Sequence, residues 1–383
     1  MTAVMLPVSM AFLYHIAFFD GWTTVGEAPM KVTEIDYKTF SCKGNPFQSS
    51  FWAMAKRPAG WKPQAFVIEI DADGTVWTDN LLVLTKKFSP GMCLSYVPFG
   101  PSVFSSPMAP VEFLRDLSKE LRKLLPGGVF AIRYDLPWDE PEEPNTLKID
   151  GRRFRTSLES VQPEGTVRLD LADGYDAVAG QYRERARRNL RKARLQTKIE
   201  AWNGTKEDFD SWYEVYLETA KRDGFSARPK SYMRRLLVFS GKMSGDVRCD
   251  LYLARHKGKI VGGCMIIESP DIAVYLFGAS LRFDDFSCSY ALQDYAVRMA
   301  CEHGCKVYDL HGIPGPGGRG AHLRGLDLFK RSFGGHAYYR TPSTDYVYRH
   351  IMWRIFTSGE KMRYRIHRHQ MSPCLQSSGS SES

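Results

Sequence analysis

The chain has 383 residues, which exceeds one ordinary domain and predicts two or three. Apolar residues make up 43% of it and charged residues 25%, so a disordered or fibrous protein is excluded. The net charge of +9 is concentrated in residues 183–198, with eight Lys or Arg against one acid, and residues 349–369, with six against one. This distribution indicates an anionic partner, such as nucleic acid, phosphate or a membrane surface, and argues against a histone-like protein that is basic throughout.

The N-terminal segment differs in character from the rest of the chain. Residues 3–19 form an apolar run that is short for a membrane span and lacks the basic flank and cleavage site of a signal peptide. Met30 opens a more ordinary start. We therefore interpret residues 1–29 as a loose extension or a misassigned start, with a membrane-associated segment as the alternative.

The eight cysteines contain no C-x-x-C pair, which disfavours a zinc ribbon or a thioredoxin-type site. Several lie in apolar stretches, which is typical of reduced, buried thiols in a cytoplasmic protein. Cys301, His303 and Cys305 are two residues apart, but a helix would direct them to different faces. We therefore interpret them as ordinary helix residues and predict no metal site.

One order of elements occurs twice along the chain. In the first half, strands at residues 64–70 and 81–85 enclose a turn at 71–74, and a helix at 111–125 precedes a strand at 129–134 that leads to Asp135. In the second half, strands at 250–255, 260–268 and 272–278 precede a helix at 289–303 and a strand at 306–308 that leads to Asp309. The repeat predicts two copies of one α/β fold, with coincidence as the alternative.

Three segments stand apart from this pattern. Residues 181–198 predict a strongly basic helix, in which Arg187, Arg191 and Arg194 share one face suited either to phosphate contacts or to solvent. The acidic, proline-rich residues 139–144 indicate a solvated loop. Residues 371–383 have the composition of a disordered tail.

Common catalytic motifs are missing from the sequence. It contains no P-loop, no strand-flanked G-x-G-x-x-G, no H-E-x-x-H and no G-x-S-x-G, so no cofactor is predicted. A Gly/Pro-rich run at residues 312–320 follows a strand, where the backbone can approach a ligand closely. Lys330 lies between Phe329 and Phe333, and we interpret it either as a fixed positive charge in a cleft or as a surface lysine.

Four segments then occur in one order along the chain. They are FQSSFWAMAK at residues 47–56, RRNLRKA at 187–193, TAKRDGF at 219–225 with Arg228 and Tyr232, and residues 308–348, which include YDLHGIPG and GLDLFKRSFGGHAYYRTPSTDYVY. Together they resemble the Fem family (FemX/FemA/FemB type) of aminoacyl-tRNA-dependent peptidoglycan peptidyltransferases. The resemblance extends from about Met30 to Tyr348.

The resemblance implies an α/β fold of two tandem GNAT-like (acyl-CoA N-acyltransferase-like) domains, with mixed sheets flanked by helices. The first would span residues 30–165 and be completed by residues 346–370, and the second would span residues 166–345. Only residues 239–247 separate a second-domain helix from the next strand, so the long coiled-coil arm of some members is not expected.

The resemblance also implies a reaction. An amino acid of the glycine, alanine or serine type would pass from aminoacyl-tRNA to the side-chain amine of the diamino acid in a peptidoglycan precursor, either lipid II or UDP-MurNAc-pentapeptide. The partners would be aminoacyl-tRNA and the precursor, without cofactor or metal. The enzyme would be cytoplasmic, with peripheral contact at the inner face of the membrane as an option.

Site residues carry over by motif. Lys56 and Arg228 would contact the diphosphate of the precursor, with Tyr232 in the same site and Tyr275 lining it. Arginine suits phosphate because its guanidinium forms a bidentate fork.

The resemblance places Lys330, preceded by Phe329, near the tRNA ester, where an ammonium group would stabilise the tetrahedral oxyanion of aminolysis. Asp135 is a candidate acceptor for the proton of the attacking amine, or else a structural carboxylate at a strand end. The tRNA-binding surface would include Arg187, Arg188, Arg191 and Arg194.

Two other functions stay open. An acetyl-CoA-dependent N-acyltransferase would use the same fold, but the [QR]-x-x-G-x-[GA] pyrophosphate loop typical of that class is not found in the sequence. A non-enzymatic RNA- or membrane-surface-binding protein would use the two basic segments, but RRM and KH signatures are also missing.

Overall fold

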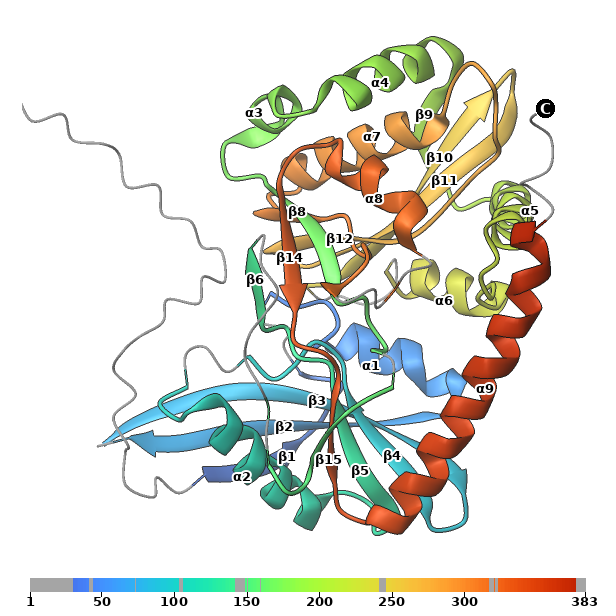
Figure 1. The fold of residues 1–383 in the computed structure, drawn as a ribbon. Coiled ribbons are helices and arrows are strands. Elements are labelled where there is room, and N and C mark those ends of the chain that lie inside the picture. Colours follow the sequence, from blue (N-terminus) through green and yellow to red (C-terminus); the bar gives the residue numbers. More distant parts are fainter. Residues whose placement is uncertain are drawn as a thin grey trace, which may run out of the picture.

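The computed structural model describes residues 30–40, 44–72, 74–102, 106–141, 149, 151–158, 160–240, 246–316, 320 and 323–376. The N-terminal extension that the sequence predicts lies outside them. The described residues form two mixed β-sheets, one above the other in Figure 1, with helices on their faces. This arrangement is the tandem α/β fold that the sequence predicts.

The first sheet has seven strands in the order β1-β2-β3-β4-β5-β15-β7. Its strands are β1 (Met30–Ile35), β2 (Trp61–Ala72), β3 (Thr75–Ser89), β4 (Met92–Val97), β5 (Val129–Tyr134), β15 (Thr344–Val347) and β7 (Phe154–Thr156). Strands β4 and β5 are parallel, and α2 (Pro110–Leu124) connects them. The apolar face of α2, which includes Phe113, Leu117 and Leu121, is buried against the sheet.

The second sheet has eight strands in the order β6-β14-β8-β13-β12-β11-β10-β9. Its strands are β6 (Asp139–Pro141), β14 (His336–Arg340), β8 (Gly165–Asp170), β13 (Val307–Asp309), β12 (Ile272–Ser280), β11 (Lys259–Glu268), β10 (Arg248–His256) and β9 (Lys198–Ala201). Strands β12 and β13 are parallel, and α7 (Cys288–Glu302) connects them. Each sheet therefore contains the hairpin, helix and strand order that the sequence repeats.

The remaining helices cover the faces of the sheets and the space between them. They are α1 (Ser50–Lys56), which continues into a 3-10 turn at Arg57–Ala59, α3 (Gly174–Gly180), α4 (Glu184–Gln196), α5 (Lys206–Asp223), α6 (Lys230–Ser240) and α8 (Arg324–Arg331). Within the part of the chain that the structure describes, no long coiled-coil arm extends from α5 or α6.

Alternating side chains of one strand pack into two different hydrophobic cores. On β11, Met265 and Ile267 pack with α5, whereas Cys264 and Ile266 pack with α7 on the opposite face. The core that contains α5 also contains α1, α6 and Leu82 and Leu84 of the first sheet. The two sheets are therefore joined by a common hydrophobic core, in which α1 and α6 lie between them (Figure 1).

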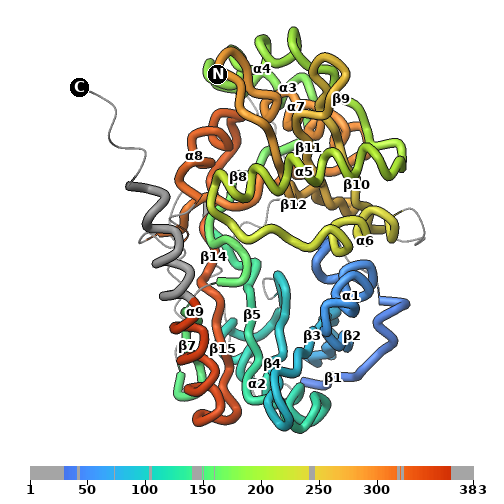
Figure 2. Tube along the Cα trace, turned by 90° about the vertical axis from the view of Figure 1, so that its right-hand side faces the viewer, coloured from blue at the N-terminus to red at the C-terminus, as the bar shows by residue number. Residues whose placement is uncertain are grey.

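The C-terminal segment returns to the first sheet. Strand β15 pairs with β5, and α9 (His350–Gln376) follows it along the side of the molecule (Figure 2). Phe356 packs on Phe130, and Arg133 of β5 forms ion pairs with Asp345 at 2.7 Å and Glu360 of α9 at 2.8 Å.

Two local predictions are wrong. The expected loop at residues 139–144 begins with strand β6, because Asp139 is buried and forms a 2.6 Å ion pair with Arg168 of β8. The expected disordered tail is helical as far as Gln376, because a helix that is nucleated by packed residues can propagate through weaker sequence. Residues 377–383 lie outside the described residues.

Candidate functional site

Lys330 is almost completely buried in the second sheet's half of the molecule. It lies on α8 with 4% exposure, and its Nζ donates to the backbone oxygens of His311 and Gly312, the latter at 2.7 Å. The same Nζ lies 5.7 Å from the ring centroid of Tyr275 on β12. Burial lowers the pKa of Lys330 to about 7, although Asp309 opposes the shift.

The backbone around Gly312 is shaped to accommodate this lysine. Strands β12 and β13 pair only from Ile272 to Val274. Beyond that point β12 continues to Ser280, whereas β13 ends at Asp309. Gly312 has φ +55°, in the left-handed region that favours glycine, and a Cβ there would make only ordinary contacts with Lys330 Nζ at 3.5 Å and the Pro163 ring at 3.4 Å. The glycine therefore allows the backbone conformation that turns its carbonyl oxygen towards the ammonium group.

Asp309, at the end of β13, organises the charges beside this lysine. Its carboxylate accepts hydrogen bonds from Thr166, from Arg168 at 3.3 Å and from Arg340 at 3.4 Å. Burial alone would raise its pKa, but the two guanidinium groups hold the pKa of Asp309 below its usual value. Asp309 is therefore a charged structural anchor for the loop that carries the two carbonyl oxygens.

Asp135, at the end of β5, is the corresponding carboxylate of the first sheet. It is 4% exposed and accepts hydrogen bonds from Tyr96 at 2.5 Å and from Ser343. Burial raises the pKa of Asp135 to about 7, against the opposing effects of Tyr96, Arg133 and Arg340. A carboxylate with a pKa near neutrality can exchange a proton at physiological pH, which is what a general base requires.

Lys56, Arg228 and Tyr232 come together between the sheets. Lys56, the last residue of α1, donates a 2.8 Å hydrogen bond to the hydroxyl of Tyr232 on α6 and lies 4.1 Å from the Trp52 ring centroid. Burial and the nearby charges of Arg228 and Lys86 lower the pKa of Lys56 to about 7. Cations that repel one another in this way form a site for an anion.

A row of contacts connects this cationic cluster with the buried lysine. Lys86 lies 5.5 Å from the Trp61 ring centroid, and Trp61 packs on Tyr96, which bonds to Asp135. The charge of Asp135 also interacts with that of Arg340. The Arg340 guanidinium carbon lies 4.6 Å from the Phe99 ring centroid. Phe99 in turn packs against His311, whose backbone oxygen binds Lys330. All of these residues lie where the two sheets face each other.

Phe329 anchors the helix that carries Lys330, and Tyr275 lies beside its ammonium group. Phe329 packs edge-to-face on Tyr290 at 4.9 Å and on Phe333 at 5.3 Å, and so fixes α8 to the second core. Tyr275 presents its ring to the ammonium group, and burial raises its pKa above the usual value. The structure therefore places Tyr275 beside Lys330 rather than beside Lys56 and Tyr232. The roles that the sequence assigns to Lys330, Phe329, Tyr275 and Asp135 stay predictions.

The basic helix α4 lies on the outer surface of the second half. Arg187, Arg188 and Arg191 are exposed, whereas Arg194 forms a 2.8 Å ion pair with Asp294 of α7. These arginines are separate from the cluster around Lys56, which α1 and α6 carry.

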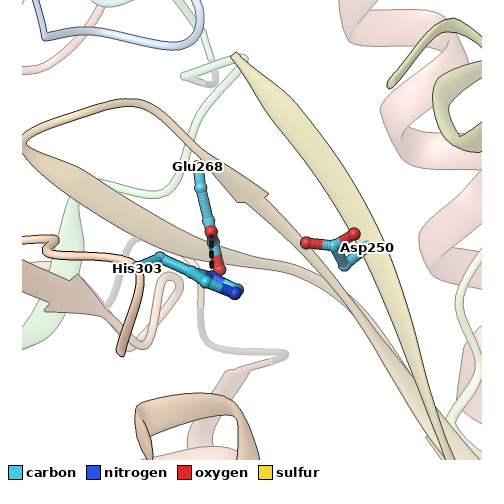
Figure 3. Close-up of side chains that lie close together, drawn as sticks. All are labelled: Asp250, Glu268 and His303. Atoms are coloured by element: carbon cyan, nitrogen blue, oxygen red, sulfur yellow. Dashed lines mark hydrogen bonds and ion pairs between the residues drawn. The ribbon is translucent and has the colours of Figure 1, made fainter. Parts of the chain in front are cut away.

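One group of described side chains has the spacing of metal ligands. Ligand atoms of Asp250, Glu268 and His303 lie within 4.8 Å of one another, and the carboxylates of adjacent strands face the imidazole (Figure 3). Arg248 already lies 2.7 Å from Asp250 and 3.6 Å from Glu268, and His303 Nδ1 lies 2.8 Å from Glu268. We interpret the group as an ion-pair network, and the expectation of no bound metal stays a prediction.

Sequence analysis misses several residues of the site. Tyr96, Lys86 and Trp61 have no motif of their own, and only the register of β2, β3 and β4 brings them beside Asp135. Arg340 is part of the C-terminal segment used for the resemblance, but nothing local indicates that it lies between two carboxylates. His311 has an unusual left-handed backbone, with φ +50°, which the sequence does not indicate.

Comparisons with known proteins show which sequences and folds this chain resembles. A family model described as an acetyltransferase (GNAT) domain matches residues 180–331. Lipid II:glycine glycyltransferase of Staphylococcus haemolyticus (strain JCSC1435) is 22% identical over 85% of this chain and 94% of that protein. The protein of the same name from Staphylococcus aureus (strain bovine RF122 / ET3-1) is 21% identical over 82% and 90%.

Among solved structures, FemX has a similar fold. Its TM-score is 0.66 at 19% sequence identity, covering 85% of this chain and all of that one. No described helix has both the length and the apolar character needed to cross a membrane. The chain is therefore similar to lipid II:glycine glycyltransferases over nearly their whole length, and its fold is similar to that of FemX, in line with the resemblance to the Fem family.

Proposed function

We propose that this protein is an aminoacyltransferase that transfers an amino acid, preferably glycine, from aminoacyl-tRNA to the side-chain amine of lipid II. The observation that carries the proposal is the row of contacts from the cations Lys56 and Arg228 to the buried pair Asp135 and Lys330. Relatives that are named for transfer of glycine to lipid II support the same reaction.

The proposed chemistry uses two of the three groups whose pKa values lie near neutrality, Asp135 and Lys330, and leaves Lys56 to bind the anion. The amine attacks the ester carbonyl carbon, a carbon–nitrogen bond forms, and the bond from that carbon to the terminal ribose oxygen breaks. Asp135 accepts the proton that the amine loses, since burial raises its pKa to about 7. Lys330, as an ammonium, stabilises the oxyanion and returns a proton to the leaving ribose oxygen.

The anion site gives the precursor its orientation. A diphosphate at Lys56, Arg228 and Tyr232 would place the peptide along Trp61 and Tyr96 towards Asp135. Tyr275 would line the same space near the reacting atoms. Tyr232 would then donate its hydroxyl hydrogen bond to a phosphate oxygen while Lys56 supplies the charge.

The basic helix α4 is proposed to bind the RNA backbone. Arg187, Arg188 and Arg191 project from it without an acidic partner among the described side chains, and Arg194 completes the face. Their number predicts a strong dependence of RNA binding on salt concentration, because each phosphate contact releases a counterion.

We further propose that α9 rests on the membrane surface that holds lipid II. Ile351, Ile355 and Met362 are 74%, 58% and 65% exposed, and their spacing of four and seven residues places them on one face of the helix. The exposed Arg354 and Lys361 add positive charge to that side of α9. A helix with this composition binds anionic lipid through its apolar stripe and its basic flanks.

Reconstitution tests the function directly. Purified protein is incubated with lipid II and glycyl-tRNA in one reaction, and with lipid II and acetyl-CoA in another, and the product masses are read. The proposal expects the mass of one or more glycyl residues in the first reaction and unchanged lipid II in the second. An acetylated product without a glycylated one would assign the chain to the acetyl-CoA class instead.

A further inference from the structure

A cavity beneath the basic helix is not used by the proposed chemistry. It has a volume of about 340 Å³ and lies between α3, α4 and α7, lined among others by Tyr175, Tyr182, Arg187, Arg191, Arg194 and Asp294. This volume falls at the lower end of the range for small-ligand pockets, enough for one compact ligand rather than a long segment. The cavity shares no lining residue with the Lys330 site.

The charge of the cavity is positive on balance, because its lining holds three arginines against two acids, Glu184 and Asp294. Arg194 and the hydroxyl of Tyr175 both bind the carboxylate of Asp294, at 2.8 Å and 2.7 Å, so that carboxylate is already neutralised. Arg187 and Arg191 form no ion pair with any side chain that the structure describes. Two unpaired guanidinium groups at the mouth of a cavity favour a phosphate, which each can bind through two parallel hydrogen bonds.

The inner wall of the cavity is aromatic. The Tyr175 ring carries Arg298 on it, with the guanidinium carbon 4.5 Å from the ring centroid. Tyr182 is 2% exposed, and its hydroxyl has no hydrogen-bond partner among the residues that the structure describes. A buried hydroxyl that lacks a partner is costly, and a ligand group inside the cavity would satisfy it.

The cavity is structurally coupled to the catalytic lysine. Just before α4, Arg183 donates its backbone N–H to the oxygen of Ser332 at 2.8 Å, and Tyr182 packs edge-to-face on Phe333 at 5.2 Å. Ser332 and Phe333 directly follow α8, which carries Lys330. A strand of RNA that ends at Lys330 would therefore pass the start of α4.

We propose that this cavity binds a single nucleotide of the RNA substrate, with its phosphate on Arg187 and Arg191, its base against Tyr175 and a polar group of the nucleotide on the Tyr182 hydroxyl. The inference rests on the proposed aminoacyl-tRNA dependence. Stacking of a base on an aromatic side chain contributes about 1–3 kcal/mol and does not depend on sequence. The cavity would fix the position of the RNA strand that carries the amino acid, so that its ester lies at Lys330.

The test measures binding of a fluorescent AMP analogue and of a single-stranded RNA hexamer to the full-length protein. Arg187→Gln and Arg191→Gln are compared with Lys192→Gln, which removes the same charge from the same helix but lies outside the cavity. We expect each arginine variant to weaken AMP binding at least 10-fold and the lysine variant less than 2-fold. The hexamer should displace the analogue from the wild-type protein.

Tyr182→Phe separates binding from folding. It removes only the hydroxyl that lacks a partner, so the thermal unfolding temperature should stay the same or rise, while AMP binding weakens about 2–10-fold through one lost hydrogen bond. Equal weakening by the three charge variants would overturn the inference, as would an AMP complex that RNA does not displace. If AMP and RNA bind as expected but no aminoacyl transfer occurs, the cavity stands and the proposed reaction fails.

Discussion

Lys56 and Tyr232 are 176 residues apart in the sequence, yet the ammonium of one donates a 2.8 Å hydrogen bond to the hydroxyl of the other. The first ends α1, which packs on the first sheet, and the second lies on α6, which packs on the second sheet. The proposed anion site therefore forms where the two halves of the protein meet.

Lys56→Met should weaken precursor binding without changing the chemical step. The substitution keeps the packing against Trp52 but removes the charge. Because a diphosphate contact persists from ground state to transition state, KM for the precursor should rise about 10-fold while kcat changes little. The exposed Lys62→Met on β2 is the matched control and should leave both constants unchanged. A fall in kcat at constant KM would contradict the binding role.

Lys330→Met should act on the chemical step. Loss of the group that stabilises the oxyanion is expected to reduce kcat about 10²–10³-fold, with little effect on KM. Arg324→Met, at the exposed start of the same helix, serves as the control and should retain the wild-type rate. Single-turnover kinetics with aminoacyl-tRNA would measure the effect, and a variant with the full rate would exclude Lys330 from the chemistry.

The rate should have a bell-shaped pH dependence centred near neutrality. Burial raises the pKa of Asp135 to about 7, so below that pH the carboxyl is protonated and cannot accept a proton from the amine. Burial lowers the pKa of Lys330 to about 7, so above it the ammonium is lost. Asp135→Asn should remove the acidic limb of the profile and leave the alkaline one. An unchanged acidic limb would assign that ionisation to another group.

Stability should show the titration of Lys330 independently of activity. Its pKa is about 7 in the folded protein and 10.5 in a free lysine, so between these values the unfolded chain binds more protons and stability falls as the pH falls. The wild-type protein loses at most about 5 kcal/mol of stability in this way, and Lys330→Met loses none of it. The variant's advantage in thermal unfolding temperature should therefore grow from pH 10 to pH 7 and then level off. If the difference in unfolding temperature did not change with pH, the pKa of Lys330 would be the same in the folded and the unfolded protein, which would contradict its burial.

The face of α9 should mediate binding to anionic vesicles. The double variant Ile351→Ser/Ile355→Ser removes two exposed apolar side chains and is expected to reduce co-sedimentation with phosphatidylglycerol vesicles at least 5-fold. Val76→Ser, at an exposed position of the β2–β3 hairpin, is the control. Equal binding of the two variants would show that this helix face does not contact lipid.

Much of the fold can be predicted from the sequence because its elements have clear local signals. Helix α2 begins with Pro110 and buries a regular apolar face, and β11 is a continuous apolar strand. Asp139 is different, since its acidic, proline-rich surroundings predict a solvated loop. Its burial in a strand is explained by Arg168 and Arg340, which are both distant in the sequence.

The candidate site also contains residues that the sequence indicates locally and residues that it does not. Lys330 is recognisable from its glycine- and phenylalanine-rich segment, and Lys56 from the motif that precedes it. The protonation states of these two lysines could not be predicted, because the pKa of each depends on burial by segments far away in the sequence. Arg340 and Tyr96 were missed for the same reason, since each acquires its role only through contact with Asp135.

The central claim is aminoacyl transfer from RNA, and the most direct measurement is incorporation of radiolabelled glycine from glycyl-tRNA into lipid II, with and without prior ribonuclease treatment. The proposed function predicts labelled lipid II with the wild-type protein, none after ribonuclease treatment, and about 10²–10³-fold slower labelling with Lys330→Met. Labelling from free glycine after ribonuclease treatment, or an undiminished rate in the variant, would contradict it.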